Sequence, residues 1–203
     1  MPEQRGRRTQ AERRDHTRNA LLDATVDCLV ELGFSRTTTT EVAHRAGVSL
    51  GALLHHFPSK ADLLAAAVGH VLERRHGDFR KAMANLDPGV DRIDAAIDLL
   101  WSAFSGPTFT AWLELWVAAR TDPGLAAAVV AVDRGFVETS QELFGELFPP
   151  AEYPEAAELG LPLAFAVMDG VALQHLVPYR NDGPATIAAF KTVARRFLRD
   201  PDS

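Results

Sequence analysis

The chain has 203 residues, 47% of them hydrophobic and 24% charged, and a formal net charge of −6. This composition fits one globular domain with an appendage or two small domains, and it excludes collagen, a disordered chain and a coiled-coil rod. The longest stretch free of charge, residues 99–113, is shorter than the roughly 18 apolar residues of a membrane-spanning helix. Because acidic residues break the N-terminal apolar run and Cys28 is the only cysteine, we expect a cytoplasmic protein without membrane contact.

The N-terminal sixty residues differ in charge from the rest. They hold nine Lys/Arg against seven Asp/Glu, a balance of +2, whereas residues 61–203 hold twelve against twenty, a balance of −8. Residues 1–18 alone hold six basic and three acidic residues. This pattern predicts an N-terminal portion that binds an anion, with a solvated tail as the alternative. The basic residues of this arginine arm are Arg5, Arg7, Arg8, Arg13, Arg14 and Arg18.

Helix patterns dominate the first part of the chain, where four helices are predicted. Apolar residues at spacings of three and four indicate the first helix, which Gly33 ends. Thr38 and Glu41 have the spacing of a capping box, and Ser49 is a suitable N-cap for the third helix. Ser59 can cap the fourth. The predicted ranges are 13–32, 41–46, 50–57 and about 60–77.

Proline marks the starts of the later helices. Four dipeptides place proline at or near a first helical position, where its missing N–H costs nothing: 87–88, 106–107, 122–123 and 183–184. Pro162 either lies in the first turn of the eighth helix or kinks it. With no strand pattern in the sequence, the predicted fold class is all-α with about nine helices. The later five are predicted at 88–105, 107–120, 123–147, 158–177 and 184–199.

Two of the short helices have the dimensions of a helix-turn-helix. Residues 41–46 and 50–57 are joined by a turn in which Gly47 can reverse the chain and Val48 can anchor it in the core. In such a pair the second helix presents its N-terminal end outward, where it can enter a DNA major groove. The spacing therefore indicates a DNA-reading element.

These residues resemble a known family. Over residues 21–72 the sequence looks like the DNA-binding domain of the tetracycline-repressor (TetR/AcrR) family of bacterial regulators. The resemblance implies an all-helical homodimer with a three-helix DNA-binding head, here residues 1–60, and a ligand-binding and dimerisation body, here 61–203. The matching stretches are GFSRTT at 33–38, EVAHRAGVSLGAL at 41–53 and HHFPSKADLL at 55–64, with weaker matches AWLELWVAAR at 111–120 and MDGVALQ at 168–174.

The resemblance implies contacts with double-stranded DNA along the helix-turn-helix and its flanks. The polar members would hold phosphates, which makes binding dependent on salt. Leu50 or Ala52 could read a thymine methyl group by apolar contact. Leu54 stands where the family commonly has a tyrosine that approaches the DNA backbone, and leucine cannot donate that hydrogen bond. The expected DNA-binding residues are Arg36, Thr38, Ser49, Leu50, Ala52, His55, His56 and Lys60, together with the arginine arm.

The body is expected to bind a small, apolar effector. Such a pocket needs apolar walls and a few polar groups. The aromatic residues after the head are spaced as in a helical core, and any one of them is more often core than pocket wall. The candidate walls are Trp112, Trp116 and Phe136, and the candidate polar contacts are Glu114, Gln174 and His175.

The last two predicted helices carry apolar residues at core spacing. They either complete a monomer core or, as the resemblance implies, form a four-helix bundle between two protomers. A twofold dimer would place two recognition helices about 34–36 Å apart and so predicts a palindromic site. The expected function is a ligand-responsive transcriptional regulator, most readily a repressor, that needs no cofactor. The alternative is a DNA-independent small-molecule-binding protein on the same fold.

Enzyme-like patterns were weighed against this function. Residues 47–51 fit G-x-S-x-G, the nucleophile elbow of hydrolases, but that motif needs a strand before the serine and here a capped helix precedes it. Residues 41–44 and 73–76 are both E-x-x-H, the spacing of di-iron bundles, but the first helix is too short and arginines flank the second histidine. We therefore expect no enzyme and no metal site. For His70 and His76, a metal sensor is the alternative to plain polar positions.

Overall fold

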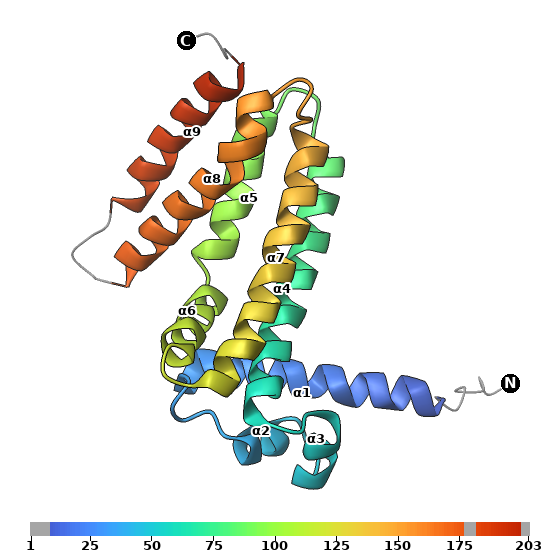
Figure 1. Cartoon of the computed structure of the whole chain (residues 1–203). Helices are drawn as coiled ribbons and strands as arrows, with labels where there is room; N and C mark the ends of the chain where they lie inside the picture. The colour runs from blue at the N-terminus through green and yellow to red at the C-terminus, as the bar shows by residue number, and fades with distance from the viewer. Residues whose placement is uncertain (1–8, 177–181, 200–203) are drawn as a thin grey trace, which may run out of the picture. The chain divides into compact units, whose positions relative to one another are not determined.

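A computed structural model describes residues 9–176 and 182–199, and these form nine helices and no strand (Figure 1). The predicted all-α fold is confirmed. No helix within these ranges is long and apolar enough to cross a bilayer. The helices are α1 Gln10–Leu32, α2 Thr39–Arg45, α3 Leu50–His56, α4 Lys60–Ala84, α5 Arg92–Phe104, α6 Pro107–Ala119, α7 Pro123–Leu147, α8 Pro154–His175 and α9 Gly183–Arg199.

Side-chain caps begin the short helices, as the sequence predicts. The Thr38 hydroxyl accepts a hydrogen bond from the Glu41 N–H at 3.2 Å, and the Ser49 hydroxyl accepts one from the Ala52 N–H at 3.2 Å. A capping box also requires the Glu41 carboxylate to accept a hydrogen bond from the Thr38 backbone N–H. This part of the prediction is wrong. The Glu41 carboxylate instead accepts from Arg45 Nε at 2.8 Å, because the (i, i+4) spacing brings a guanidinium within reach.

Three helix boundaries differ from the prediction by more than a turn. One is the start of α8, predicted at residue 158, which lies at Pro154 because proline suits the first turn of a helix. α4 continues past Gly77 to Ala84, because a glycine weakens a helix by only about 1 kcal/mol and packing can offset that. α5 begins at Arg92 and not at Pro88. The reason is Asp91, whose carboxylate accepts hydrogen bonds from two backbone N–H groups and makes it the N-cap, while Gly89 turns the chain with a φ of 125°. Pro162 lies inside α8.

The chain divides into two compact units. Unit 1 contains the described residues up to His70 together with 111–132, and unit 2 contains 71–110 and the described residues from Asp133 onward. Three helices, α4, α6 and α7, therefore contribute residues to both units. The predicted division at residue 60 cuts the chain once, in sequence order. Unit 1 instead also contains residues 111–132, some fifty residues after that point.

The core of unit 1 holds the two short helices against α1. α2 and α3 lie side by side along α1 (Figure 1). Leu53 of α3 is fully buried, and Val42 of α2 and Leu21 of α1 are buried in the same cluster. Gly47 makes the predicted turn with a φ of 66°, a conformation that residues with a Cβ rarely adopt. This packing fixes which face of α3 points outward.

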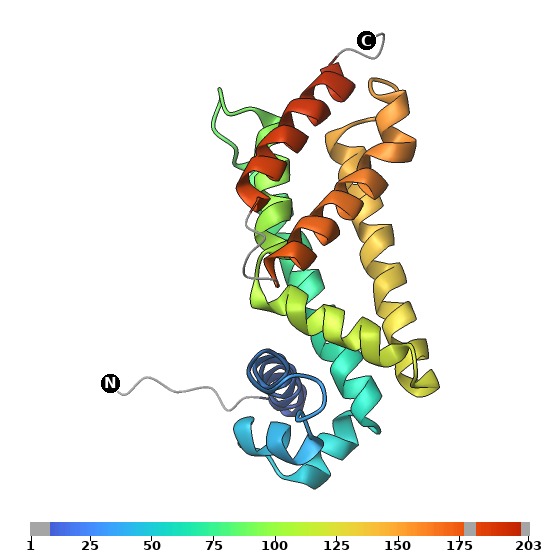
Figure 2. The same cartoon turned by 90° about the vertical axis from the view of Figure 1, so that its left-hand side faces the viewer.

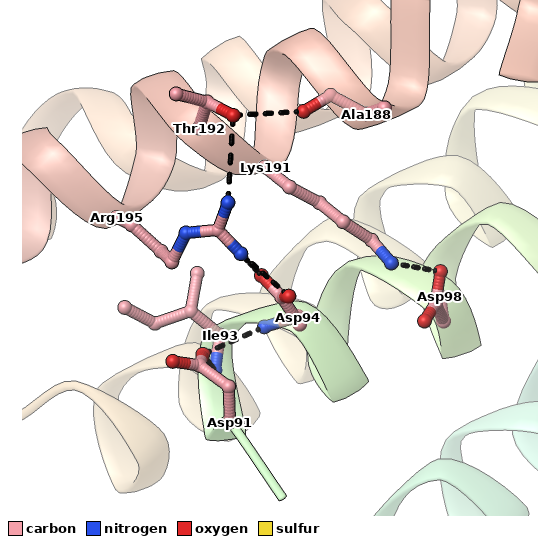
Figure 3. Close-up of polar contacts among 8 residues, drawn as sticks. All are labelled: Asp91, Ile93, Asp94, Asp98, Ala188, Lys191, Thr192 and Arg195. Carbon is pink, nitrogen blue, oxygen red and sulfur yellow. Dashed lines mark hydrogen bonds and ion pairs between the residues drawn. The ribbon is translucent and has the colours of Figure 1, made fainter. Parts of the chain in front are cut away.

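In unit 2, α5, α8 and α9 pack against one another (Figure 2). Ile97, Met168 and Ile187, one from each helix, are buried in a single cluster. Ion pairs join α9 to α5 beside this cluster (Figure 3): Arg195 Nη1 lies 2.6 and 2.5 Å from the Asp94 oxygens, and Lys191 pairs with Asp98. The register of α9 on α5 is thus set by apolar packing and by charge.

We expect Leu53→Ala to lower the free energy of unfolding by about 2–5 kcal/mol, because it leaves a cavity in a fully buried site. Leu54→Ala is the matched control. Leu54 is 46% exposed, so its truncation changes stability by about 0.5 kcal/mol or less. Urea denaturation of the full-length variants at one protein concentration measures both. Equal costs for the two variants would show that α3 is not anchored as described.

Candidate nucleic-acid interface

The outward face of α3 is mainly apolar. Leu50 is 41% exposed and Leu54 46%, His55 is exposed, and Ala52 is half-buried. Leu53 points the other way, into the core of unit 1. The outward side chains supply few hydrogen-bond donors, so this face can offer a base mainly apolar contact and the His55 ring.

Thr38 and Ser49 lie at the starts of α2 and α3, and both are exposed. Each hydroxyl oxygen accepts one hydrogen bond from the backbone of its own helix. The hydroxyl hydrogen of each remains available to donate to a phosphate oxygen. The capping role and the predicted DNA contact are therefore compatible in the same side chain.

A basic hollow of about 660 Å³ opens between the first turns of α1 and the end of α3. Arg14, Arg18 and His56 line it, with Gln10, Ala11 and Asp15 completing the wall. The Arg18 guanidinium lies 4.8 Å from the centre of the Phe57 ring, which holds it in place by a cation–π contact. Partial burial, together with the charges of Arg14, His55 and Arg18, lowers the pKa of His56. Of the predicted arginine arm, Arg5, Arg7 and Arg8 lie outside the described residues.

Lys60 and Arg36 are engaged with the protein itself. Lys60 Nζ donates to the Phe34 carbonyl oxygen at 3.2 Å and lies 4.6 Å from the centre of the Phe34 ring. Burial lowers the pKa of Lys60. Arg36 Nε donates to the Leu32 carbonyl oxygen at the end of α1 at 3.0 Å, although the residue is exposed. The predicted phosphate contact of Lys60 would thus compete with its contacts to Phe34.

Glu114, a candidate polar contact for the effector, lies in unit 1 and binds the loop before the helix-turn-helix. Its carboxylate accepts a hydrogen bond from the Phe34 N–H in the loop between α1 and α2. The two residues are 80 positions apart in sequence. Helical spacing within α6 carries no information about such a contact, so the sequence offered no signal for it.

The predicted effector residues are divided between the two units. Trp112 is buried and packs against Trp116 in unit 1, with their ring centres 5.4 Å apart. Phe136, Gln174 and His175 belong to unit 2. Gln174 is half-buried and His175 is exposed, with its Nδ1 3.0 Å from the Val171 carbonyl oxygen. Unit 1 holds Trp112 in its interior, so its ring acts there as core.

Unit 2 contains a cluster of aromatic rings that could not be predicted from the sequence. The ring of Phe136 stacks on His76 on one side, at 5.0 Å, and on Phe165 on the other, at 5.4 Å. His76 Nε2 lies 2.9 Å from the Ser140 hydroxyl, and burial together with Arg80 lowers its pKa. The pair of Phe136 and Phe165 shows that these faces of α7 and α8 oppose each other.

A carboxylate lies one helical turn from this ring pair. Asp169 follows Phe165 by four residues on α8, so the two share a helix face. Its Oδ1 atom is shut off from solvent and has no hydrogen-bond partner within the described part of the chain. Burial and the charge of Asp133 raise the pKa of Asp169. A buried acceptor without a donor is costly, so this position requires an explanation beyond packing.

The structure gives no support to the enzyme-like patterns. Ser49 of the G-x-S-x-G match caps a helix and follows another helix, whereas a nucleophile elbow requires a strand. Within residues 9–176 and 182–199, no three potential ligands among His, Cys, Asp and Glu gather as a metal site would need. His70 pairs with Asp23 at 3.6 Å.

Comparison with known proteins settles the family. Residues 21–67 match the family described as bacterial regulatory proteins, tetR family, and residues 88–200 match the C-terminal part of BetI-type transcriptional repressors. The second match alone covers more than half of the chain. The chain belongs to the TetR family of bacterial regulators. This confirms the predicted family, whose members are DNA-binding transcriptional regulators and not enzymes.

Individual relatives agree with this membership. An uncharacterized HTH-type transcriptional regulator of Mycobacterium tuberculosis is 34% identical over 171 residues, which cover 82% of this chain and 86% of the relative. The HTH-type transcriptional regulator CymR of Pseudomonas putida is also 34% identical over 171 residues, with 84% of each chain covered. A solved transcriptional regulator from Pseudomonas aeruginosa has a TM-score of 0.66 at 26% identity and covers 97% of this chain and 100% of its own.

The lowered pKa of His56 predicts that DNA binding strengthens as the pH falls. His56 in the free TetR-family protein is mainly neutral at pH 7, because its pKa lies below the usual value. A DNA phosphate beside it would raise that pKa, so binding takes up a proton, and affinity rises by at most about tenfold per pH unit as the pH falls toward the lowered pKa of the free protein. His56→Gln should flatten this slope, measured by fluorescence anisotropy with labelled duplex, whereas His175→Gln in unit 2 should keep it. The same slope in wild type and His56→Gln would exclude this role.

Proposed function

We propose that this protein is a cytoplasmic, homodimeric repressor that a small molecule releases from a palindromic operator. The position of α3 is the observation that supports the DNA-binding part of this proposal. Its inner face is locked in the core of unit 1 and its outer face is exposed beside the basic hollow. Such an arrangement suits insertion of the outer face into a major groove while the flanks hold the backbone.

In this proposal Leu50, Ala52 and His55 contact the DNA bases, and the groups around them contact the DNA backbone. The apolar pair suits the C5-methyl group of thymine, which lies in the major groove. Arg14, Arg18 and His56 suit a phosphate because they converge on one hollow at the edge of α3. Thr38 and Ser49 add hydroxyl donors. Binding should therefore weaken steeply with salt.

The second copy of the chain has a surface to which it can bind. Three leucines on α8 and Leu176, which follows the helix as its C-cap, are at least 44% exposed, and their spacing of three or four residues, or sums of these, places them along one side of the helix. Val193 on the neighbouring α9 is 55% exposed. An apolar stripe on a monomer is costly in water, and the family relationship supports a second protomer as its cover. The leucines are Leu159, Leu163, Leu173 and Leu176.

The effector site belongs, in this proposal, to the ring cluster of unit 2. Phe136 and Phe165 offer apolar ring surface, and Asp169 offers a buried oxygen that lacks a donor. An apolar molecule that carries a hydrogen-bond donor would satisfy that oxygen. Effector binding then releases DNA to the extent that it favours a conformation with the two heads wrongly spaced.

A DNA-independent binding protein is the second candidate. The observation that favours it is the apolar outer face of α3, where Leu50 and Leu54 present no hydrogen-bond group to DNA. The two candidates make opposite predictions for sequence-specific binding, which decides between them.

The deciding experiment is selection of binding sites from random duplex DNA by the purified full-length protein at near-physiological salt. We expect an enriched palindrome with half-sites about one helical turn apart. Sedimentation of the enriched duplex with the protein should give two chains per duplex. A pool without enrichment, even at low salt where phosphate contacts alone should hold DNA, would reject the repressor and favour the second candidate.

Asp169→Asn should stabilise the protein at pH 7. The raised pKa means that the folded state disfavours the ionised carboxyl, so removing its charge should raise the free energy of unfolding at pH 7. This gain should shrink as the pH falls through the raised pKa, where the wild-type group takes up its proton. Urea denaturation across that pH range measures it, and Asp78→Asn, an exposed carboxyl of α4, is the control. Destabilisation by Asp169→Asn at pH 7 would instead mark Asp169 as a structural group.

A further inference from the structure

The backbone of Phe34, in the loop between α1 and α2, is held through both its N–H and its carbonyl group. Its N–H donates to the Glu114 carboxylate of α6, and its carbonyl oxygen accepts from Lys60 Nζ of α4 at 3.2 Å. The Lys60 ammonium also lies over the Phe34 ring. Hydrogen bonds to charged groups are stronger than those between neutral groups. One bond holds the peptide group between Gly33 and Phe34 and the other holds the group between Phe34 and Ser35, so together they fix the backbone on both sides of Phe34.

The neighbouring residue makes room for the carboxylate. Gly33 has a φ of 75°, and a Cβ at this position would lie 3.0 Å from one Glu114 oxygen and 3.2 Å from the other. A residue with a side chain would therefore meet both backbone strain and a close contact. The carbonyl oxygen of Gly33 in turn accepts from the Thr37 hydroxyl at 2.8 Å. The loop is thus bound to α6 at its start and to itself at its end.

This loop determines where the reading element begins. Thr37 is buried, and Thr38 immediately after it caps α2. α2 in turn packs on α3, which carries Leu50 and His55. A change in the direction of the Phe34 backbone would tilt the start of α2, and with it the exposed face of α3. All of these residues belong to unit 1.

We propose that Glu114 is a positioning residue for DNA binding: by accepting the Phe34 N–H, its carboxylate sets the direction from which the helix-turn-helix leaves α1. Glu114 touches no DNA in this proposal. Residues 111–132 then belong functionally with the DNA-reading unit, although they follow the helix-turn-helix by some fifty residues. The inference rests on the proposed operator binding and assigns a role within it.

The sign of the effect separates this role from that of a plain surface charge. A carboxylate that merely lies on a DNA-binding unit repels the phosphates, so its removal strengthens binding and does so equally for all sequences. Loss of a positioning contact weakens binding to the selected operator and leaves weak, sequence-independent binding unchanged. Glu114→Gln loses the charge but keeps an oxygen that can accept the Phe34 N–H. Glu114→Ala loses both.

The experiment uses the full-length protein and the duplex enriched by selection. Fluorescence anisotropy gives the dissociation constants of wild type, Glu114→Ala, Glu114→Gln and the control Asp27→Ala, which removes an exposed carboxyl of α1 in the same unit. The same titrations against a scrambled duplex at low salt give sequence-independent binding. Hydrogen exchange of the Phe34 amide in wild type and Glu114→Gln reports on the hydrogen bond directly.

We expect Glu114→Ala to bind the operator roughly tenfold more weakly, and Glu114→Gln to recover most of that loss. Asp27→Ala should bind as tightly as wild type or slightly more tightly. Glu114→Ala that binds as tightly as wild type, or equal losses in the alanine and glutamine variants, would overturn the proposal. Rapid exchange of the Phe34 amide in wild type would overturn it even where the alanine variant fails to fold. Failure of wild type to bind any selected duplex is a different result, because it rejects the repressor function itself.

Discussion

The burial of Leu53 is the constraint on which the DNA-binding unit depends. A seven-residue helix is too short to be stable alone, so α3 exists because Leu53 and Phe57 pack into the cluster built by α1 and α2. Because that face of α3 packs into the core, helix geometry places Leu50 and His55 on the surface. The same apolar packing that stabilises the unit therefore selects its reading face.

Polar contacts fix the positions of helix starts and loops that apolar packing alone does not determine. Capping hydroxyls at Thr38 and Ser49 fix the two starts of the helix-turn-helix, and charged groups from α4 and α6 hold the Phe34 backbone between them. In unit 2 the corresponding contacts join α9 to α5 through Arg195 and Asp94. Asp169 is the exception, since its buried oxygen lowers stability without a partner. Sites that bind ligands commonly carry such a cost.

Local features of the fold could be predicted from the sequence, and contacts across it could not. Capping residues and N-terminal prolines act within one turn, so Ser49, Pro107 and Pro123 gave correct helix starts. Pro88 failed because Asp91 offers a better N-cap three residues later. For the candidate site, the family resemblance implied that Leu50 and His55 face outward, and both are exposed in the structure. The role of Glu114 depends on a partner 80 residues away, and the grouping of Trp112 with unit 1 depends on tertiary packing.

Reading of DNA bases by the apolar face of α3 is the central claim, and thymine methyl groups test it most directly. The measurement compares the affinity of the protein for its selected operator with that for the same duplex carrying uracil in place of thymine. We predict weaker binding to the uracil duplex for wild type, and a smaller difference for Leu50→Ala, because the methyl contact is then already lost. Equal affinity of wild type for the two duplexes would contradict the account.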